Sequence, residues 1–306
     1  MVTFLLLEFS DICKLQILHF LIFLVLYLTA VTGNLLIIFA IALAHHLHTP
    51  MYFFLINLAM VDLGSISVLV PKSMTMSLTN NRSIAYSGCV AQVFFYAFFA
   101  ATDISLLTIM AHDHNVATCN PLHYERIMHK EACLQMVAFG WLAGLLYATL
   151  HTCGTFANTF CSNIISQFFC EIPQLLKLSC SDIYLVEVGI VVLSCNIGLG
   201  CFIFIIVTYV KIFSAVFRIP SVHSQKKALS TCLPHLTVFA LFAFSGIFAY
   251  ARPPSDASPD LGIAFAVLYG IILPMLNPFI YSMRNKEIKA ALWKLLDVEH
   301  SSKTSL

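Results

Sequence analysis

The chain has 306 residues, of which 59% are hydrophobic and only 10% are charged, and its formal net charge at pH 7 is +1. About a quarter of the residues in a soluble globular domain are charged, so this composition excludes an ordinary soluble domain and indicates a membrane protein. The balanced net charge gives no reason to expect a nucleic-acid partner.

A helix needs about 20 apolar residues to cross the hydrocarbon core of a bilayer. Seven segments of the chain have this character: 15–43, 52–76, 90–112, 133–153, 184–210, 229–250 and 261–283. The first seven residues lack the basic region of a signal peptide, so we expect the first run to remain in the protein as a signal anchor. We find no internal repeat and no large loop domain, so residues 1–306 are predicted to form one domain, an all-α membrane protein with a seven-transmembrane helix bundle.

The basic residues predict how this bundle is oriented. Of the 16 lysines and arginines, eleven fall on the side that carries the C-terminus and five fall on the other side. Positive residues are enriched on the cytoplasmic side of membrane proteins. We therefore expect the N-terminus to be extracellular and the C-terminus to be cytoplasmic.

Two aspartates lie well inside predicted spans, Asp62 in the second and Asp103 in the third. An ionised carboxylate in hydrocarbon is costly, so acids in such positions indicate a functional site. Two facing acids at low dielectric need a cation or a shared proton. The alternative is a structural network of hydrogen bonds that holds no ion.

Four of the eleven cysteines gather at the predicted outer face, where oxidation can occur: Cys89, Cys161, Cys170 and Cys180. Four cysteines allow three sets of pairings. The remaining seven are better explained as small apolar residues or free thiols.

The seventh span carries Asn277, Pro278 and Tyr281 in its second half and then becomes basic. A proline in a membrane helix frees a backbone carbonyl, and a buried asparagine finds no water, so both need partners from neighbouring helices. Such a break near the end of a helix predicts a part that moves.

Several motifs occur in order along almost the whole chain, from about Phe9 to Leu292. They are Gly33-Asn34, Leu47 to Tyr52, Asn57-Leu58-Ala59 with Asp62, Pro71-Lys72, Met110-Ala111, Cys119 to Tyr124, Phe168 to Glu171, Leu175 to Cys180, Lys227 to Cys232 with His235, and Pro274 to Lys286 around Asn-Pro-x-x-Tyr. Together they resemble the olfactory receptors, a branch of the rhodopsin-like (class A) G-protein-coupled receptors.

The resemblance implies a multi-pass receptor of the cell membrane that is not an enzyme. Its ligands would be small, mostly volatile and mostly apolar organic molecules, and it would signal through a stimulatory heterotrimeric G protein to cyclic AMP. The basic residues Arg284, Lys286, Lys289 and Lys294 would form a short amphipathic eighth helix on the lipid of the inner leaflet, although a plain positive-inside anchor would look the same. The rival from another class is a transporter or channel, which usually shows repeated halves or a ring of pore-lining charges.

The resemblance also implies two disulfides and an ion site. The bridges would be Cys89–Cys170 and Cys161–Cys180, with Cys89–Cys180 as an alternative. In related receptors the equivalents of Asn34, Asp62 and Asn277 form a polar site that can hold sodium. Asp103 stands where olfactory receptors usually have a glutamate, so the charge is kept on a shorter arm. We expect no cofactor other than Na⁺.

The odorant pocket implied by the family lies in the outer half of the bundle, between spans three, five, six and seven. The positions that carry over are Tyr96, Ala97, Ala100, Leu193, Ile197, Ala243, Ile247 and Tyr250. Such a pocket would be mainly apolar with a few polar groups. Ala243 replaces a tyrosine that the family usually has there. The alternative reading of each position is ordinary packing between helices.

The inner end of the third span departs from the family. Asp113, His114 and Asn115 stand where the family pattern is Asp-Arg-Tyr. Arginine suits a coupling switch because its charge is permanent and its planar group is long, whereas histidine is shorter and near-neutral at cytoplasmic pH. One hypothesis is a receptor-like product with weak or lost G-protein coupling, and the opposite hypothesis is that His114 substitutes adequately. The other switch positions implied by the family are Tyr209, Asn277, Pro278 and Tyr281.

Two weaker patterns remain. Asn81-Arg82-Ser83 fits the glycosylation tripeptide in a predicted outer loop. His112 and His114 flank Asp113, but adjacent helical residues point in different directions and zinc needs three or four converging ligands. We therefore expect no metal site at these histidines.

Overall fold

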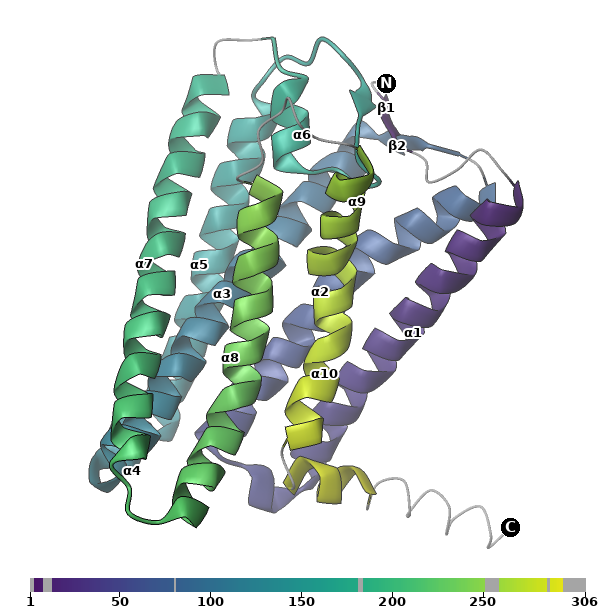
Figure 1. Ribbon diagram of the computed structural model, residues 1–306. Coiled ribbons are helices and arrows are strands. Elements are labelled where there is room, and N and C mark those ends of the chain that lie inside the picture. The colour runs from purple at the N-terminus through teal and green to yellow at the C-terminus, as the bar shows by residue number, and fades with distance from the viewer. Residues whose placement is uncertain are drawn as a thin grey trace, which may run out of the picture.

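A computed structural model of the protein describes residues 3–7, 13–79, 81–180, 184–250, 259–284 and 287–293. Within these residues, seven helices are long and apolar enough to cross a membrane. The predicted fold class is therefore confirmed. Figure 1 shows the helices running side by side between two ends of the molecule, with α1 and α2 leaning away from the other helices toward one end.

Each predicted span corresponds to one long helix or to consecutive helical segments. They are α1 (Cys13–Leu43), α2 (Pro50–Thr79), α3 (Tyr86–Cys119), α5 (Lys130–Phe156), α7 (Tyr184–Phe217) and α8 (Val222–Tyr250), and the seventh consists of α9 (Pro259–Val267), the π-helical turn η3 (Leu268–Ile272) and α10 (Leu273–Arg284). Most helices extend past the predicted apolar runs, because a helix continues into polar residues beyond the hydrocarbon without losing its backbone hydrogen bonds.

Short elements close the two ends of the bundle. One end carries η1 (His45–Leu47), η2 (Pro121–His123) and α4 (Tyr124–Ile127), and the other carries α6 (Ile172–Lys177) and three short strands. In Figure 1 the strands and α6 lie at the end opposite α4. Residues 287–293 are helical as well, which agrees with the expected eighth helix.

The strand end also carries two disulfides, Cys89–Cys170 and Cys161–Cys180. These are the pairs that the family resemblance implied, and the alternative bridge between Cys89 and Cys180 is not formed. Disulfides persist in oxidising compartments, so this end is the extracellular one. The orientation agrees with the distribution of basic residues.

A three-stranded sheet lies over the outer end and was not predicted. The strand β1 (Thr3–Leu6) pairs antiparallel with β2 (Ser83–Ala85) and parallel with β3 (Ile164–Ile165). Phe4 and Leu6 on β1 are fully buried. The start of the chain is thereby attached to both outer loops by backbone hydrogen bonds and by two apolar side chains.

The third span is central to the packing, because α3 contacts α2, α5, α7 and α8. Membrane helices associate closely where small residues let their backbones approach. Gly144 on α5 is such a point, since a Cβ added there would lie 2.9 Å from the backbone oxygen of Phe98 on α3. This close contact fixes the position of α3. The same helix carries residues of the cavity inside the bundle and of the inner end around Asp113 and His114, which are described below.

A buried polar contact joins α5 to α7. His151 Nδ1 lies 2.6 Å from Glu187 Oε1, and His151 Nε2 lies 2.8 Å from Ser194 Oγ. The side chains of His151 and Glu187 are 2% and 0% exposed. Neither residue was predicted to have a partner in the bundle.

Candidate functional site

A cavity lies inside the bundle between α2, α3, α8 and the seventh span. Its wall combines apolar and aromatic side chains with four other polar side chains, those of Asp62, Ser65, Asp103 and Asn277. The apolar and aromatic residues are Val61, Tyr96, Phe99, Ala100, Val238, Phe242, Tyr269, Leu273 and Pro274. The cavity is narrow, with about 20 Å³ of space for the centre of a water molecule. One water molecule needs roughly 10–15 Å³ by that measure, so the cavity in this conformation has room for one water or one small ion.

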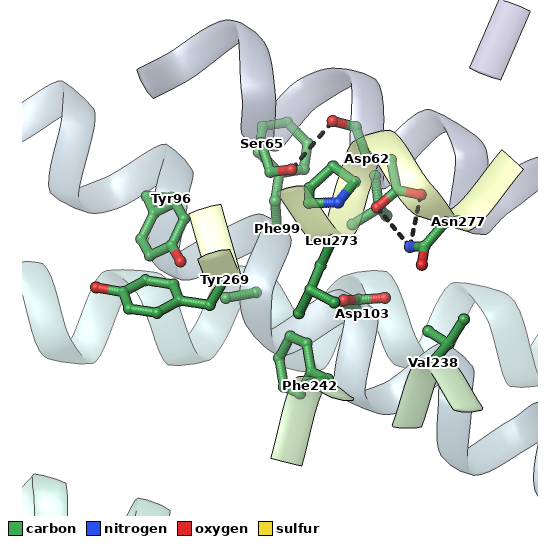
Figure 2. Close-up of a pocket in the computed structure, with 13 residues that line it drawn as sticks. Asp62, Ser65, Tyr96, Phe99, Asp103, Val238, Phe242, Tyr269, Leu273 and Asn277 are labelled. Carbon is green, nitrogen blue, oxygen red and sulfur yellow. Dashed lines mark hydrogen bonds between the residues drawn. The ribbon is translucent and has the colours of Figure 1, made fainter. Parts of the chain in front are cut away.

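The inner part of the cavity is polar (Figure 2). Asn277 Nδ2 donates to both carboxylate oxygens of Asp62, at 3.1 and 2.9 Å. Asn34 Nδ2 donates to the backbone oxygen of Pro274 at 3.0 Å. That oxygen is the carbonyl that Pro278 leaves without its helical donor four residues later, because proline has no N–H. The partner that the sequence required for the proline break is therefore Asn34.

Several oxygen atoms in this region have no hydrogen-bond partner among the described residues. They are Asp103 Oδ1, Asn277 Oδ1 and the hydroxyl of Tyr281. Asp62 and Asp103 are 2% and 9% exposed, and both line the cavity. Carboxylate and amide oxygens are the donors that hard cations prefer, so this set of atoms fits a cation such as Na⁺.

The outer part of the cavity is aromatic. The ring centroids of Tyr96 and Tyr269 are 6.3 Å apart, and both rings lie near Phe169 of the outer loop, at 5.7 and 6.5 Å. Figure 2 shows Tyr96 and Tyr269 together on the side of the cavity away from Asn277. An apolar wall with a few polar groups suits a small organic ligand.

Only part of the predicted ligand set lines the cavity. Tyr96 and Ala100 do, whereas Ala97 is buried outside it and Ala243 packs beside the cluster between α7 and α8. Ile247 and Tyr250 belong to α8, but their side chains lie outside what the structure describes.

The prediction for Leu193 and Ile197 is wrong. Their side chains are 59% and 61% exposed on the outer surface of α7. The two residues do share a helix face, but that face points away from the bundle. The physical reason is that a face in contact with lipid is as apolar as the wall of a ligand pocket, so hydrophobicity does not distinguish them.

Other cavity residues were missed although a signal for them exists. Ser65, Phe99 and Leu273 lie three or four positions from Asp62, Asp103 and Asn277, and residues with these spacings share a helix face. Extending the faces of the three polar residues by one turn would have found them. Tyr269 follows at the next such step in the seventh span.

At the inner end, Asp113 and His114 do not pair with each other. The hydroxyl of Tyr124 donates to Asp113 Oδ1 at 2.7 Å. Burial, together with the nearby charge of Asp113, raises the pKa of Tyr124 well above its usual range, so its hydroxyl remains a donor. His114 is 4% exposed, and neither of its ring nitrogens has a hydrogen-bond partner in the part of the chain that is described. Asn115 is half-buried beside them.

The ring of His114 lies against His235 of α8, with the centroids 5.4 Å apart. His235 Nε2 donates to the backbone oxygen of Leu107 at 2.8 Å, because a carbonyl can only accept, and His235 Nδ1 lies 2.7 Å from the hydroxyl of Tyr209. His235 thus connects α3, α7 and α8 at the inner end, and His114 contributes a ring contact to it.

Two peripheral predictions can be placed. Asn81 is exposed between α2 and α3, and its side-chain oxygen accepts hydrogen bonds from the backbone N–H and the hydroxyl of Ser83. In residues 287–293, Ile288 and Ala291 are buried while Lys289 is exposed, so this helix is amphipathic. The side chains of Arg284, Lys286 and Lys294 lie outside the described residues.

The family model for olfactory receptors matches residues 23–299 of the chain. Among human proteins, the chain is 47% identical to olfactory receptor 14A16 over 294 residues, which covers 96% of this chain and 95% of that protein. It is 48% identical to olfactory receptor 14I1, covering 95% and 94%, and 42% identical to olfactory receptor 5B21, covering 96% and 95%.

Proposed function

The chain belongs to the olfactory receptor family, and we propose that it detects small, mostly apolar organic molecules and signals through a stimulatory heterotrimeric G protein to cyclic AMP. The observation that carries the ligand class is the aromatic outer part of the cavity, where Tyr96 and Tyr269 face each other. The experiment is expression of an epitope-tagged chain with an olfactory G protein. Surface labelling and cyclic AMP would be measured without ligand and with a broad odorant mixture.

The ligand would occupy the outer part of the cavity beside Tyr96, Ala100, Phe242 and Tyr269. In the described conformation this space is too narrow for an odorant, so binding has to separate these side chains. The ligand would fill the space that opens between the lining side chains of the cavity. A larger side chain at a lining position therefore competes with the ligand for that space.

We expect Ala100→Leu to raise the odorant concentration for half-maximal cyclic AMP by about tenfold or more, since overpacking costs about 1–3 kcal/mol. The control is Leu193→Ala, which changes a lipid-facing side chain and should leave the response within about twofold. Both variants are compared at equal surface labelling. A larger effect of Leu193→Ala than of Ala100→Leu would mean that the ligand lies elsewhere.

For the polar inner part of the cavity we propose a bound Na⁺, held by Asp62, Asp103 and Asn277. The unpartnered oxygens of Asp103 and Asn277 support this assignment, and a proton shared between the two aspartates is the alternative. The ion would stabilise the arrangement in which α2, α3 and α10 approach one another around it.

The sodium proposal predicts that NaCl raises the melting temperature of the purified receptor more than an equal concentration of choline chloride. A ligand present at about 100 times its Kd adds about 2.7 kcal/mol to stability. Asp103→Asn should remove the difference between the two salts, and Glu131→Gln, at an exposed inner position, should not. Equal melting temperatures of the unmodified receptor in both salts would support the shared proton instead.

The receptor is a multi-pass protein of the cell membrane. We propose that its helix of residues 287–293 rests on the inner leaflet, with exposed Lys289 toward the lipid headgroups. Tyr52 of α2 holds the start of this helix by donating to Glu287 Oε2 at 2.7 Å.

A further inference from the structure

The outer loop places one acidic residue, Glu171, directly after the disulfide-bonded Cys170. The backbone N–H of Cys170 donates to Gln92 Oε1 of α3 at 2.9 Å, and Gln92 Nε2 donates to the backbone oxygen of Val68 at 3.2 Å. The bridge and these two bonds attach this part of the loop to α3 and α2. Glu171 therefore projects from a fixed point over the outer end of the bundle.

The carboxylate of Glu171 is turned toward the bundle. Glu171 is 8% exposed, and it occupies the position before the first residue of α6 without capping that helix. Its Oε1 atom accepts a hydrogen bond from the hydroxyl of Tyr269 at 2.6 Å. A bond of this length between a hydroxyl and a carboxylate is typical of a charge-assisted hydrogen bond.

Tyr269 belongs to η3, the π-helical turn that interrupts the seventh span, and it lines the cavity. Such turns occur frequently at functional sites. The ring of Tyr269 contacts those of Tyr96 and Phe169. The orientation of the Tyr269 ring therefore determines the position of the outer wall of the cavity. A tyrosine ring turns about two side-chain bonds, and the hydrogen bond from its tip restricts both.

We propose that Glu171 is a positioning residue for ligand recognition: it holds the hydroxyl of Tyr269 and so fixes the outer wall of the cavity. This inference rests on the proposed function, because it concerns the site where the odorant binds. Glu171 does not contact the cavity itself. It acts through Tyr269.

The contact should respond to extracellular pH. Burial raises the pKa of Glu171 above its ordinary value of 4.5, although hydrogen bonds from Tyr269 and Gln167 and the charge of Lys177 act in the opposite direction. Within the described residues, these three are the polar and charged groups that act on Glu171, from η3, the outer loop and α6. Protonation removes the charge that strengthens the bond from Tyr269, so acidification should loosen the outer wall.

The sign of the effect on stability is opposite. A carboxyl with a raised folded pKa binds its proton more tightly in the folded receptor than in the unfolded chain. Its contribution to stability is therefore most favourable below pH 4.5 and becomes less favourable as the pH rises through the raised value. Stability and ligand potency thus move in opposite directions with pH, which a purely structural role for Glu171 does not predict.

The test uses the full-length receptor with Glu171→Gln, Tyr269→Phe and the double variant. Melting temperature of the purified protein is measured from about pH 7.5 to about pH 5, together with the odorant concentration for half-maximal cyclic AMP at the same external pH values. Glu131→Gln, which removes an exposed carboxylate at the inner end, is the control.

We expect both single variants to raise the half-maximal concentration several-fold at neutral pH, and the double variant to add little, because both remove the same contact. Glu171→Gln should also flatten the pH dependence of both readouts. Additive effects, or a pH dependence of potency that persists in Glu171→Gln, would overturn the proposal. If neither the unmodified receptor nor the variant with His114→Arg and Asn115→Tyr answers any odorant, the proposed function fails. The melting curves alone still decide whether Glu171 and Tyr269 are coupled.

Discussion

Replacing His114 with arginine and Asn115 with tyrosine should raise the odorant-stimulated cyclic AMP signal about tenfold or more at equal surface labelling. A tenfold change corresponds to about 1.4 kcal/mol, which is below the roughly 2–5 kcal/mol lost when one partner of a buried charged pair is removed from an interface. The expectation follows from the chemistry of the two side chains. Arginine is always charged and reaches further, whereas a neutral imidazole offers one donor on a short arm.

The structure gives this prediction a specific basis. His114 packs against His235, and neither of its ring nitrogens has a hydrogen-bond partner within the described residues. Asp113 is engaged by Tyr124 at 2.7 Å instead. Among the described residues His114 thus forms no hydrogen bond, and it carries no permanent charge to present to a G protein.

The matched control is His112→Arg, which adds the same charge two residues earlier on α3, at a half-buried position. It should leave the signal unchanged within about twofold, because residues two apart on a helix do not face the same partner. A strong response of the unmodified receptor, equal to that of the double variant, would show that His114 couples adequately. A gain with His112→Arg alone would indicate a general effect of added positive charge.

The predictions that succeeded depend on interactions strong enough to show in local sequence. The seven spans follow from the length and polarity of the bilayer, which no tertiary contact can override. Asp62 and Asn277 were recognised because polar groups in hydrocarbon need partners, and the structure joins them at 2.9 and 3.1 Å. The carbonyl that Pro278 frees was expected to need a neighbour, but the identity of that neighbour, Asn34, is settled by helix packing.

The predictions that failed depend on the direction in which a face points. Leu193 and Ile197 were assigned to the pocket, yet they face outward, because lipid and ligand both select apolar side chains. The strand β1 was missed for another reason. Its four residues pair with two segments far away in the chain, and so short a segment carries too few alternating positions to predict a strand.

The contact between His151 and Glu187 was also missed, because both residues lie near the outer ends of their spans, where polar side chains ordinarily reach water or headgroups. The structure instead buries both completely between α5 and α7. Gly154 contributes to this arrangement, since a side chain at that position would collide with Glu187 Oε2. Three residues on two helices therefore depend on one another, although none of them forms a recognisable motif.

Removing one member of this pair should be the most damaging single change to folding. Breaking a buried pair costs about 3–5 kcal/mol in soluble proteins, because the remaining group is left buried and unpaired. Hydrogen bonds between membrane helices are worth less, about 0.6 kcal/mol on average and 1.7 at most, since the separated helices also find partners. We therefore expect His151→Leu and Glu187→Leu each to cost roughly 1–2 kcal/mol and to reduce surface labelling several-fold.

The double variant His151→Leu with Glu187→Leu should recover much of that loss, because replacing a buried polar pair with apolar residues is often neutral or stabilising. The measurement is a double-mutant cycle on melting temperature and surface labelling, with Glu187→Gln as the matched control that keeps a hydrogen-bond acceptor for His151. Losses that simply add would show that the two side chains act independently. Recovery in the double variant would instead establish that the α5–α7 contact needs two side chains that match each other, either both polar or both apolar. It would also show that neither polar group is required when the other is absent.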